Sequence, residues 1–185
     1  MKKVILATML VLVGAFGAMA QSTQTANEFN VGYNFLRQDI KVERPVIAFN
    51  ENTDSHGFTA GYTRYLGGDP TKISGVGVTG EVAANFDGNE ATLVTAMGGI
   101  TLKARNFEYV QPYARALGGV AKQNVNRGNL TNFSDVSAVF DLGGGLNFNL
   151  GQRSRYKVQV GADYVNTGFM GERQHGVRLS TGLIF

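Results

Sequence analysis

The chain has 185 residues, of which 43% are hydrophobic and 17% are charged, with 25 glycines and no cysteine or tryptophan. This length fits one domain, and the charged fraction is lower than in an ordinary soluble domain. The lack of cysteine excludes disulfides, thiolate catalysis, cysteine-based metal centres and a lipid-modified cysteine anchor.

The first twenty residues have the pattern of a signal peptide. A basic start at 1–3 precedes an apolar stretch at 4–17, and residues 18–20 (Ala-Met-Ala) form a small-x-small cleavage pattern. The apolar stretch is short for a membrane helix of about 20 residues, so an uncleaved anchor is the less favoured alternative. We therefore expect residues 1–20 to be removed before Gln21. The mature chain would keep 15 basic and 14 acidic residues.

Beyond residue 20, apolar and polar residues alternate with a period of two, and no apolar run is as long as a membrane helix requires. Most of the alternating stretches are near the ~10 residues that a tilted membrane strand needs. The pattern predicts eight β-strands. Their apolar positions span residues 29–35, 58–62, 76–86, 94–102, 114–120, 136–148, 158–164 and 177–185.

The connections between these stretches alternate in length. Short connections fall at 67–71, 105–108 and 150–154, and the other four, three of them long and polar, fall at 37–55, 87–90, 124–134 and 166–174. With both termini on the short side, this layout predicts an all-β fold. We expect a closed, eight-stranded, antiparallel, up-and-down transmembrane β-barrel spanning residues 21–185. A soluble β-sandwich is the alternative, but it would carry more surface charge.

Charged residues identify the face that lines the lumen. Near the middle of the stretches, five of them share the polar face: Glu81, Arg115, Asp141, Asp163 and Arg178. An Arg or Lys facing lipid at mid-depth costs about 2–4 kcal/mol, so the parity places all five inside the barrel. Lys103 and Lys157 share this face near the periplasmic mouth.

Charges at similar depth in a narrow barrel must pair, so we expect the five central residues to form an ion-pair network. The network is either a gate that opens by rearrangement or a plug that fills the barrel. An eight-stranded barrel is just wide enough for side chains to fill, which favours the plug.

Aromatic residues fall near both predicted ends of the strands, as in the two interface girdles of a membrane barrel. Phe29, Phe148 and Phe185 are at the periplasmic end, and Phe58 and Phe86 are at the extracellular end. Arg64 is an exception because it is charged and has the outward parity. It lies near the periplasmic end of its strand, from which its side chain can reach the membrane interface.

Other motifs give weak signals for chemistry. Residues 75–80 match G-x-G-x-x-G, but strand alternation runs through them, whereas a dinucleotide site requires a helix to follow. His56 and His175 lie near predicted extracellular strand ends, and the adjacent Asp54 and Ser55 do not by themselves make a triad. We expect no catalytic residues, no metal and no cofactor. The sequence has no basic stripe, so we expect no nucleic-acid partner.

The predicted mature chain as a whole resembles the small eight-stranded outer-membrane β-barrels of the OmpA/OmpX type. Its last stretch ends in phenylalanine after alternating apolar residues, and is similar to the C-terminal signal that this family presents to the barrel-assembly machinery. The corresponding residues here are Val177, Leu179, Thr181, Leu183 and Phe185.

The resemblance implies a location in the outer membrane of a Gram-negative-type bacterium, in contact with outer-membrane lipid and lipopolysaccharide. Since the chain ends at Phe185, we do not expect the peptidoglycan-binding domain of full-length OmpA-like proteins.

We expect a monomer with a structural or surface-interaction (adhesin-like) role. An extracellular partner could bind through loop 37–55, either as an ordinary exposed loop or as a hairpin whose edge accepts another strand. A narrow pore for ions or small solutes is the alternative function. A lipid A-modifying enzyme, as some members of the class are, would require His56 or His175 to hydrogen-bond to a serine or acid of another strand.

Overall fold

The computed structural model describes residues 27–44, 47–66, 74–88, 91–104, 107, 109–126, 132–150, 156–169 and 173–185. The predicted signal peptide, residues 1–20, lies outside the described residues, and so does the whole connection at 67–71. Eight strands account for nearly all of the described chain. They are β1 (Asn27–Arg44), β2 (Ile47–Leu66), β3 (Ser74–Asp87), β4 (Ala91–Ala104), β5 (Val110–Asn126), β6 (Asn132–Asn149), β7 (Lys157–Thr167) and β8 (Gln174–Ile184).

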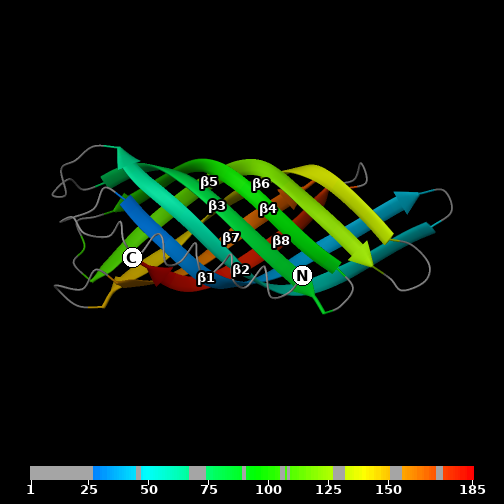
Figure 1. Cartoon of the computed structure of the whole chain (residues 1–185), viewed down its shortest axis with the longest axis horizontal. Helices are drawn as coiled ribbons and strands as arrows, with labels where there is room; N and C mark the ends of the chain where they lie inside the picture. Colours follow the sequence, from blue (N-terminus) through cyan, green and yellow to red (C-terminus); the bar gives the residue numbers. More distant parts are fainter. Residues whose placement is uncertain are drawn as a thin grey trace, which may run out of the picture.

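The strands form one closed antiparallel barrel in chain order, which confirms the predicted fold (Figure 1). Pairing of β8 with β1, from Asn30–Ile184 to Asp39–His175, closes the sheet. The path from Ile184 through each direct strand partner runs once around the barrel. It returns to β8 at Gln174, the other end of that strand, and not at Ile184. A displaced register of this kind requires tilted strands, as Figure 1 shows.

The barrel has two ends. The terminal end is where β1 begins and β8 finishes, and the hairpin end is where β1 connects to β2 and β7 to β8. Among the described residues, no helix is long and apolar enough to cross a membrane.

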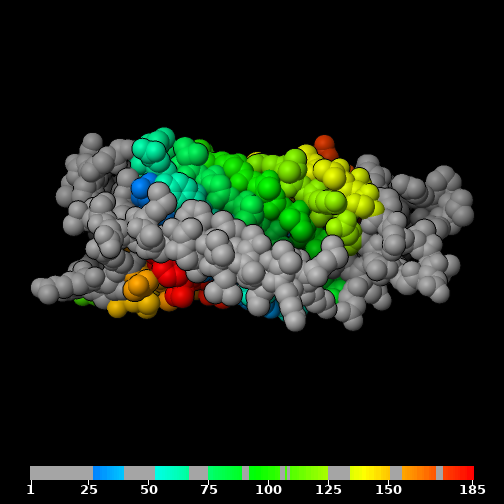
Figure 2. Space-filling model, viewed as in Figure 1, coloured from blue at the N-terminus to red at the C-terminus, as the bar shows by residue number. Residues whose placement is uncertain are grey.

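Side chains alternate between lumen and outer surface as predicted. Val82 is 55% exposed and Leu142 is 54% exposed, whereas Glu81 and Asp141, their neighbours in sequence, are buried. Because successive residues of a strand point to opposite faces, this places the apolar residues outside and the charged residues inside. Figure 2 shows the outer face, on which successive strands follow one another in diagonal bands.

Aromatic residues mark the terminal end of the outer face. The ring centroid of Phe185 lies 6.4 Å from that of Phe29 and 5.6 Å from that of Tyr156. Arg64 is exposed at the same end of β2, opposite Asn27 of β1. The aromatic positions therefore agree with an interface girdle at this end.

Of the two forms expected for the connection at 37–55, the ordinary exposed loop was wrong and the hairpin is confirmed. Antiparallel pairing of β1 with β2 continues to Arg44 opposite Ile47, so most of this segment is a hairpin that projects at the right-hand end of Figure 1. The periodic signal fails here because the apolar residues change parity at Leu36, whereas the backbone pairing continues in the same register. Strand pairing likewise enters the predicted loop 124–134, where Asn124 faces Ser134.

Candidate functional site in the barrel lumen

Five strands bring together the five central charged residues, which form an ionic layer. Each side chain is at least nine-tenths buried, with the residue exposed by 7% or less: Glu81 of β3, Arg115 of β5, Asp141 of β6, Asp163 of β7 and Arg178 of β8. All five occupy lumen-facing positions because their strands alternate with the parity that the sequence indicated.

Arg115 binds carboxylates of three other strands. Its Nη2 and Nε donate to the two oxygens of Asp163 at 2.6 and 2.9 Å, in a two-pronged contact. Its Nη1 donates to Glu81 Oε2 at 2.6 Å, and its Nε lies 3.8 Å from Asp141 Oδ1. Planar guanidinium groups favour this arrangement because several donors are held in a fixed geometry.

Arg178 contacts the same three acids. Its Nη2 donates to Asp141 Oδ2 at 2.6 Å, its Nε lies 3.3 Å from Asp163 Oδ2, and its Nη1 lies 2.9 Å from Glu81 Oε1. Every carboxylate therefore contacts both guanidinium groups. Removing any one residue leaves a buried charge with fewer partners, which is costly in a low-dielectric lumen.

A second group of charges closes the terminal end and is named the mouth cluster: Glu28, Lys103 and Lys157. The carboxylate of Glu28 on β1 accepts from Lys103 of β4, and from Lys157 of β7 at 2.7 Å. The hydroxyl of Tyr65 donates to Glu28 as well, at 3.0 Å. Glu28 thus links strands on opposite sides of the mouth. Sequence reasoning found both lysines and missed Glu28, although it shares the inward parity of Asn30.

The two groups have opposite net charges. Three carboxylates and two guanidinium groups give the ionic layer a formal charge of −1, while one carboxylate and two ammonium groups give the mouth cluster a charge of +1. The lumen charges named here therefore balance as a whole. This balance lets the barrel bury many charges without a large uncompensated field.

An apolar layer, which the sequence analysis missed, fills the lumen toward the hairpin end. Each of its members is at most 6% exposed: Leu36, Leu93, Met97, Leu117, Ala121, Val139, Val165 and Phe169. The missed signal was the parity itself, since Leu117, Val139 and Val165 share the inward parity of the neighbouring charged residues. Eight-stranded interiors are filled by side chains, and here both polar and apolar ones serve.

The chain directly after β7 contributes to the apolar layer through Phe169. Phe169 is fully buried, and the backbone N–H of Gly168 donates to Ser137 Oγ of β6 at 2.7 Å. Beside it, Gln38 Nε2 of β1 donates to Thr167 Oγ1 at 2.9 Å and to Gln174 Oε1 at 3.2 Å. These contacts tie β1, β7 and β8 together across the seam at which the barrel closes.

The two histidines lie on the outer surface at the hairpin end, each beside a tyrosine. His56 Nδ1 is hydrogen-bonded to the hydroxyl of Tyr33, and His175 Nδ1 to that of Tyr164. Asn166 Nδ2 lies 2.9 Å from His175 Nδ1. Within the described part of the chain, neither histidine has a serine or carboxylate partner. The contact on which the hypothesis of a lipid-modifying enzyme depended is therefore not formed among these residues.

The remaining sequence motifs lie on strands. The glycine motif at 75–80 belongs to β3, paired with both neighbours, so it lacks the strand-to-helix turn of a dinucleotide site. The alternate residues from Val177 to Phe185 point outward, with Val177 and Leu179 about half exposed. Within the described ranges, no cluster of three or more His, Asp or Glu side chains is arranged to hold a metal ion.

Comparisons with known proteins agree on the fold. No protein-family model matches the sequence, and no curated protein is similar to it in sequence. Neisserial surface protein A has a similar structure, with a TM-score of 0.62 and 10% identity over 86% of this chain and 96% of that chain. The N-terminal β-barrel domain of Pseudomonas aeruginosa OprF gives a TM-score of 0.52 and 13% identity, over 87% and 98% of the chains.

This chain therefore has the fold of the small eight-stranded outer-membrane β-barrels. At such identities the likeness concerns the fold alone. It assigns neither an activity nor a partner.

Proposed function

We propose that this chain is an integral outer-membrane protein whose hairpin end faces outward and binds an extended segment of another polypeptide, while its lumen stays closed. The observation that carries the proposal is the β1–β2 hairpin, which continues as a two-stranded ribbon beyond the rest of the barrel. Outer-membrane lipid, including lipopolysaccharide, would surround the apolar outer face, and no catalysis is proposed.

The ribbon consists of residues 40–44 and 47–55. Pairing of β1 with β8 stops at Asp39, and pairing of β2 with β3 stops at His56. Beyond these points, within the described strands, β1 and β2 pair with each other alone. Each arm therefore has an outer edge with backbone N–H and C=O groups to which a further strand can pair. Strand addition at such an edge is a common mode of peptide recognition.

The side chains that fill the lumen favour a plug over an open pore. The ionic layer spans it, the apolar layer lies on one side and the mouth cluster on the other. Two cavities that share Arg115 as a lining residue have about 20 and 10 Å³ of free space, roughly the size of single water molecules. Ions with a hydration shell need a wider path than this.

Shortening the ribbon tests the surface role. Residues 41–50 would be replaced by an Asn-Gly turn, which favours two-residue hairpins. The control shortens the β5–β6 hairpin by joining Asn124 to Ser134 with the same turn. The measurement is attachment of bacteria that display each barrel to cultured epithelial cells. We expect loss for the shortened ribbon and retention for the control. Equal attachment by both would refute the ribbon as the binding element.

Single-channel recording tests the closed lumen. The refolded mature chain, Glu81→Ala and Arg178→Ala would be compared in a planar bilayer, with folding checked by heat-modifiable migration. We expect no discrete openings from the parent chain. Openings that change with either substitution would instead establish the narrow pore, with the ionic layer as its gate.

The C-terminal strand is proposed as the signal for the barrel-assembly machinery, read through its outward alternate residues up to Phe185. Phe185→Asp should leave the protein in the periplasm, whereas Arg64→Gln, at the same end of the barrel, should assemble normally. Normal amounts of folded Phe185→Asp barrel in the outer membrane would contradict this assignment.

A further inference from the structure

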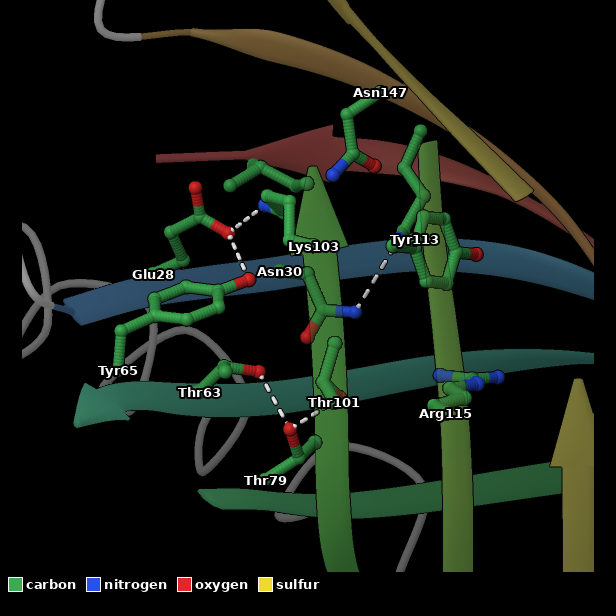
Figure 3. Close-up of a pocket in the computed structure, with 12 residues that line it drawn as sticks. Glu28, Asn30, Thr63, Tyr65, Thr79, Thr101, Lys103, Tyr113, Arg115 and Asn147 are labelled. Carbon is green, nitrogen blue, oxygen red and sulfur yellow. Dashed lines mark hydrogen bonds and ion pairs between the residues drawn. The ribbon is translucent and has the colours of Figure 1, made fainter. Parts of the chain in front are cut away.

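Three polar contacts in the lumen join β1 to β7 across the strand between them, β8. Lys157 Nζ donates to Glu28 Oε1 at 2.7 Å, Asn30 Nδ2 donates to Gln159 Oε1 at 3.3 Å, and Gln38 Nε2 donates to Thr167 Oγ1 at 2.9 Å. Figure 3 shows Glu28 and Asn30 directed from β1 into the lumen. In each pair the β7 residue lies 129 positions after its partner on β1. The three contacts therefore share one register, and together they form a seam latch.

Glycines of β8 leave room for these contacts. Gly182 is the direct strand partner of Gln159, and Gly176 is that of Gln38. A Cβ at Gly182 would lie 2.5 Å from the carbonyl oxygen of Val31, so the backbones are too close there for a side chain. In a narrow closed barrel the inward side chains converge, which lets β1 and β7 meet although they are two strand spacings apart, about 9.6 Å.

The pairing of β1 with β8 differs from the other pairings of the described strands. The others join strands that follow each other in the chain, whereas this one joins the first strand to the last. A slip of one residue would turn every side chain of a strand to the wrong face, but a slip of two residues would keep each side chain on its own face. The alternation of the sequence therefore does not select between registers that differ by two residues.

The ionic layer does not select this register either, because its five residues lie on β3, β5, β6, β7 and β8 and none of them on β1. Asp163 and Arg178 are direct partners, so the ionic layer aligns β7 with β8. The seam latch joins β1 to these two aligned strands. A slip of β1 by two residues would move it about 7 Å along them, and the present contacts would be lost together.

We propose that the seam latch is a register check, which selects the alignment in which β1 closes on β8. The native register satisfies all three contacts at once. A barrel slipped by two residues buries the same polar groups without these partners, which is unfavourable. The latch thus supplies, for the pairing that closes the barrel, the specificity that hairpin connections and side-chain alternation do not provide.

Disulfide mapping of the seam tests the proposal, and the chain has no cysteine of its own. Phe35→Cys with Leu179→Cys reports the native register, since these residues are direct partners. Phe35→Cys with Val177→Cys or with Thr181→Cys reports a slip of two residues in either direction. Diagonal neighbours are about 7–8 Å apart, whereas a disulfide needs a Cβ–Cβ distance of about 4 Å. The refolded mature chain would be oxidised in lipid vesicles, and the cross-linked fraction measured on a denaturing gel.

The latch variant combines Asn30→Ala, Gln38→Leu and Lys157→Met. We expect its slipped disulfides to increase about tenfold or more over the parent chain, because the lost hydrogen bonds no longer favour the native register. The matched control, Thr63→Val with Thr101→Val, removes lumen hydrogen bonds among β2, β3 and β4 and should give the native disulfide alone. Native pairing alone in the folded latch variant would overturn the proposal, and so would slipped disulfides of equal yield in the control.

Milder variants keep the test decisive if the latch variant does not refold. Asn30→Ala and Gln38→Leu each retain two of the three contacts and should give a smaller yield of slipped disulfide. The exchange Asn30→Gln with Gln159→Asn keeps an amide pair at this position and should restore native pairing. The native disulfide alone in both single variants would also refute the register check.

This inference goes beyond the proposed surface role and does not depend on it. Refolding in vesicles involves neither attachment to cells nor the assembly machinery, so failure of those proposals would leave the disulfide pattern unaffected. A latch variant that pairs only in the native register would likewise leave the ribbon and the C-terminal signal standing.

Discussion

The ionic and apolar layers share three strands, on which their residues are only two positions apart, yet they differ completely in chemistry. On β5, Arg115 is followed on the inward face by Leu117. On β6 and β7, Asp141 and Asp163 have Val139 and Val165 as their inward neighbours toward the hairpin end. The lumen therefore changes from charged to apolar within one step along three neighbouring strands.

This difference shows two ways of filling a narrow barrel. The ionic layer depends on specific partners, because each carboxylate contacts both guanidinium groups at defined distances. The apolar layer depends on volume, because its members contact one another without directional bonds. The first arrangement tolerates few substitutions, whereas the second tolerates substitutions that preserve volume.

The largest effect is expected from breaking the ionic layer. Arg115→Met leaves three buried carboxylates with one guanidinium group, and should lower the free energy of unfolding by about 3–5 kcal/mol. Urea titration of the refolded barrel in lipid vesicles measures this. The double variant Arg115→Met/Asp163→Leu should be less destabilised than the single one, because it removes a pair. If the double variant instead loses as much free energy of unfolding as Arg115→Met and Asp163→Leu lose together, the two residues act independently.

A smaller loss is expected from emptying part of the apolar layer. Leu117→Ala removes a side chain that is 1% exposed and should cost about 2–4 kcal/mol, from lost apolar contact and the cavity left behind. Leu117→Met, which preserves volume, should cost less than about 1.5 kcal/mol. The same urea titration compares them. Equal losses in both variants would contradict filling by volume.

A glycine at the level of the ionic layer, Gly143, is the direct strand partner of both Arg115 and Asp163 and gives an intermediate test. A Cβ at Gly143 would collide with Asp163 Oδ1 and lie 2.6 Å from Asp163 Cα, so Gly143→Ala should displace that carboxylate. We expect a loss of about 1–3 kcal/mol, as for overpacking. The control, Gly118→Ala, faces outward, where the nearest atom to the new Cβ is 3.9 Å away. A neutral Gly143→Ala would show that the ionic layer can shift without cost.

The smallest effect is expected at the exposed ion pair of the hairpin end. Arg37 Nε lies 3.7 Å from Asp54 Oδ1, with side chains 61% and 52% exposed. Solvent screens such pairs, so Arg37→Gln should change stability by less than about 1 kcal/mol. Comparing its unfolding midpoint with that of Arg115→Met separates burial from charge. A loss as large as that of Arg115→Met would mean that burial is not what makes the ionic layer important.

Local sequence pattern was sufficient for the existence of the eight strands and for the face on which the five residues of the ionic layer lie. The period of two is a property of the extended backbone, so Glu81 and Val82 must point to opposite sides of any sheet that contains them. The cost of a charge in lipid then assigns those sides. The positions of Lys103 and Lys157 inside the terminal end follow from the same rule.

The tertiary structure decided which charges meet. Arg115 and Arg178 share three carboxylates because barrel closure and strand tilt bring five strands to one depth, and register between distant strands is not encoded in any local pattern. The same holds for Glu28, which reaches Lys157 across β8, and for the ribbon, whose pairing continues after the apolar alternation has stopped. Parity is a local property of the backbone, whereas partnership depends on how the whole sheet closes.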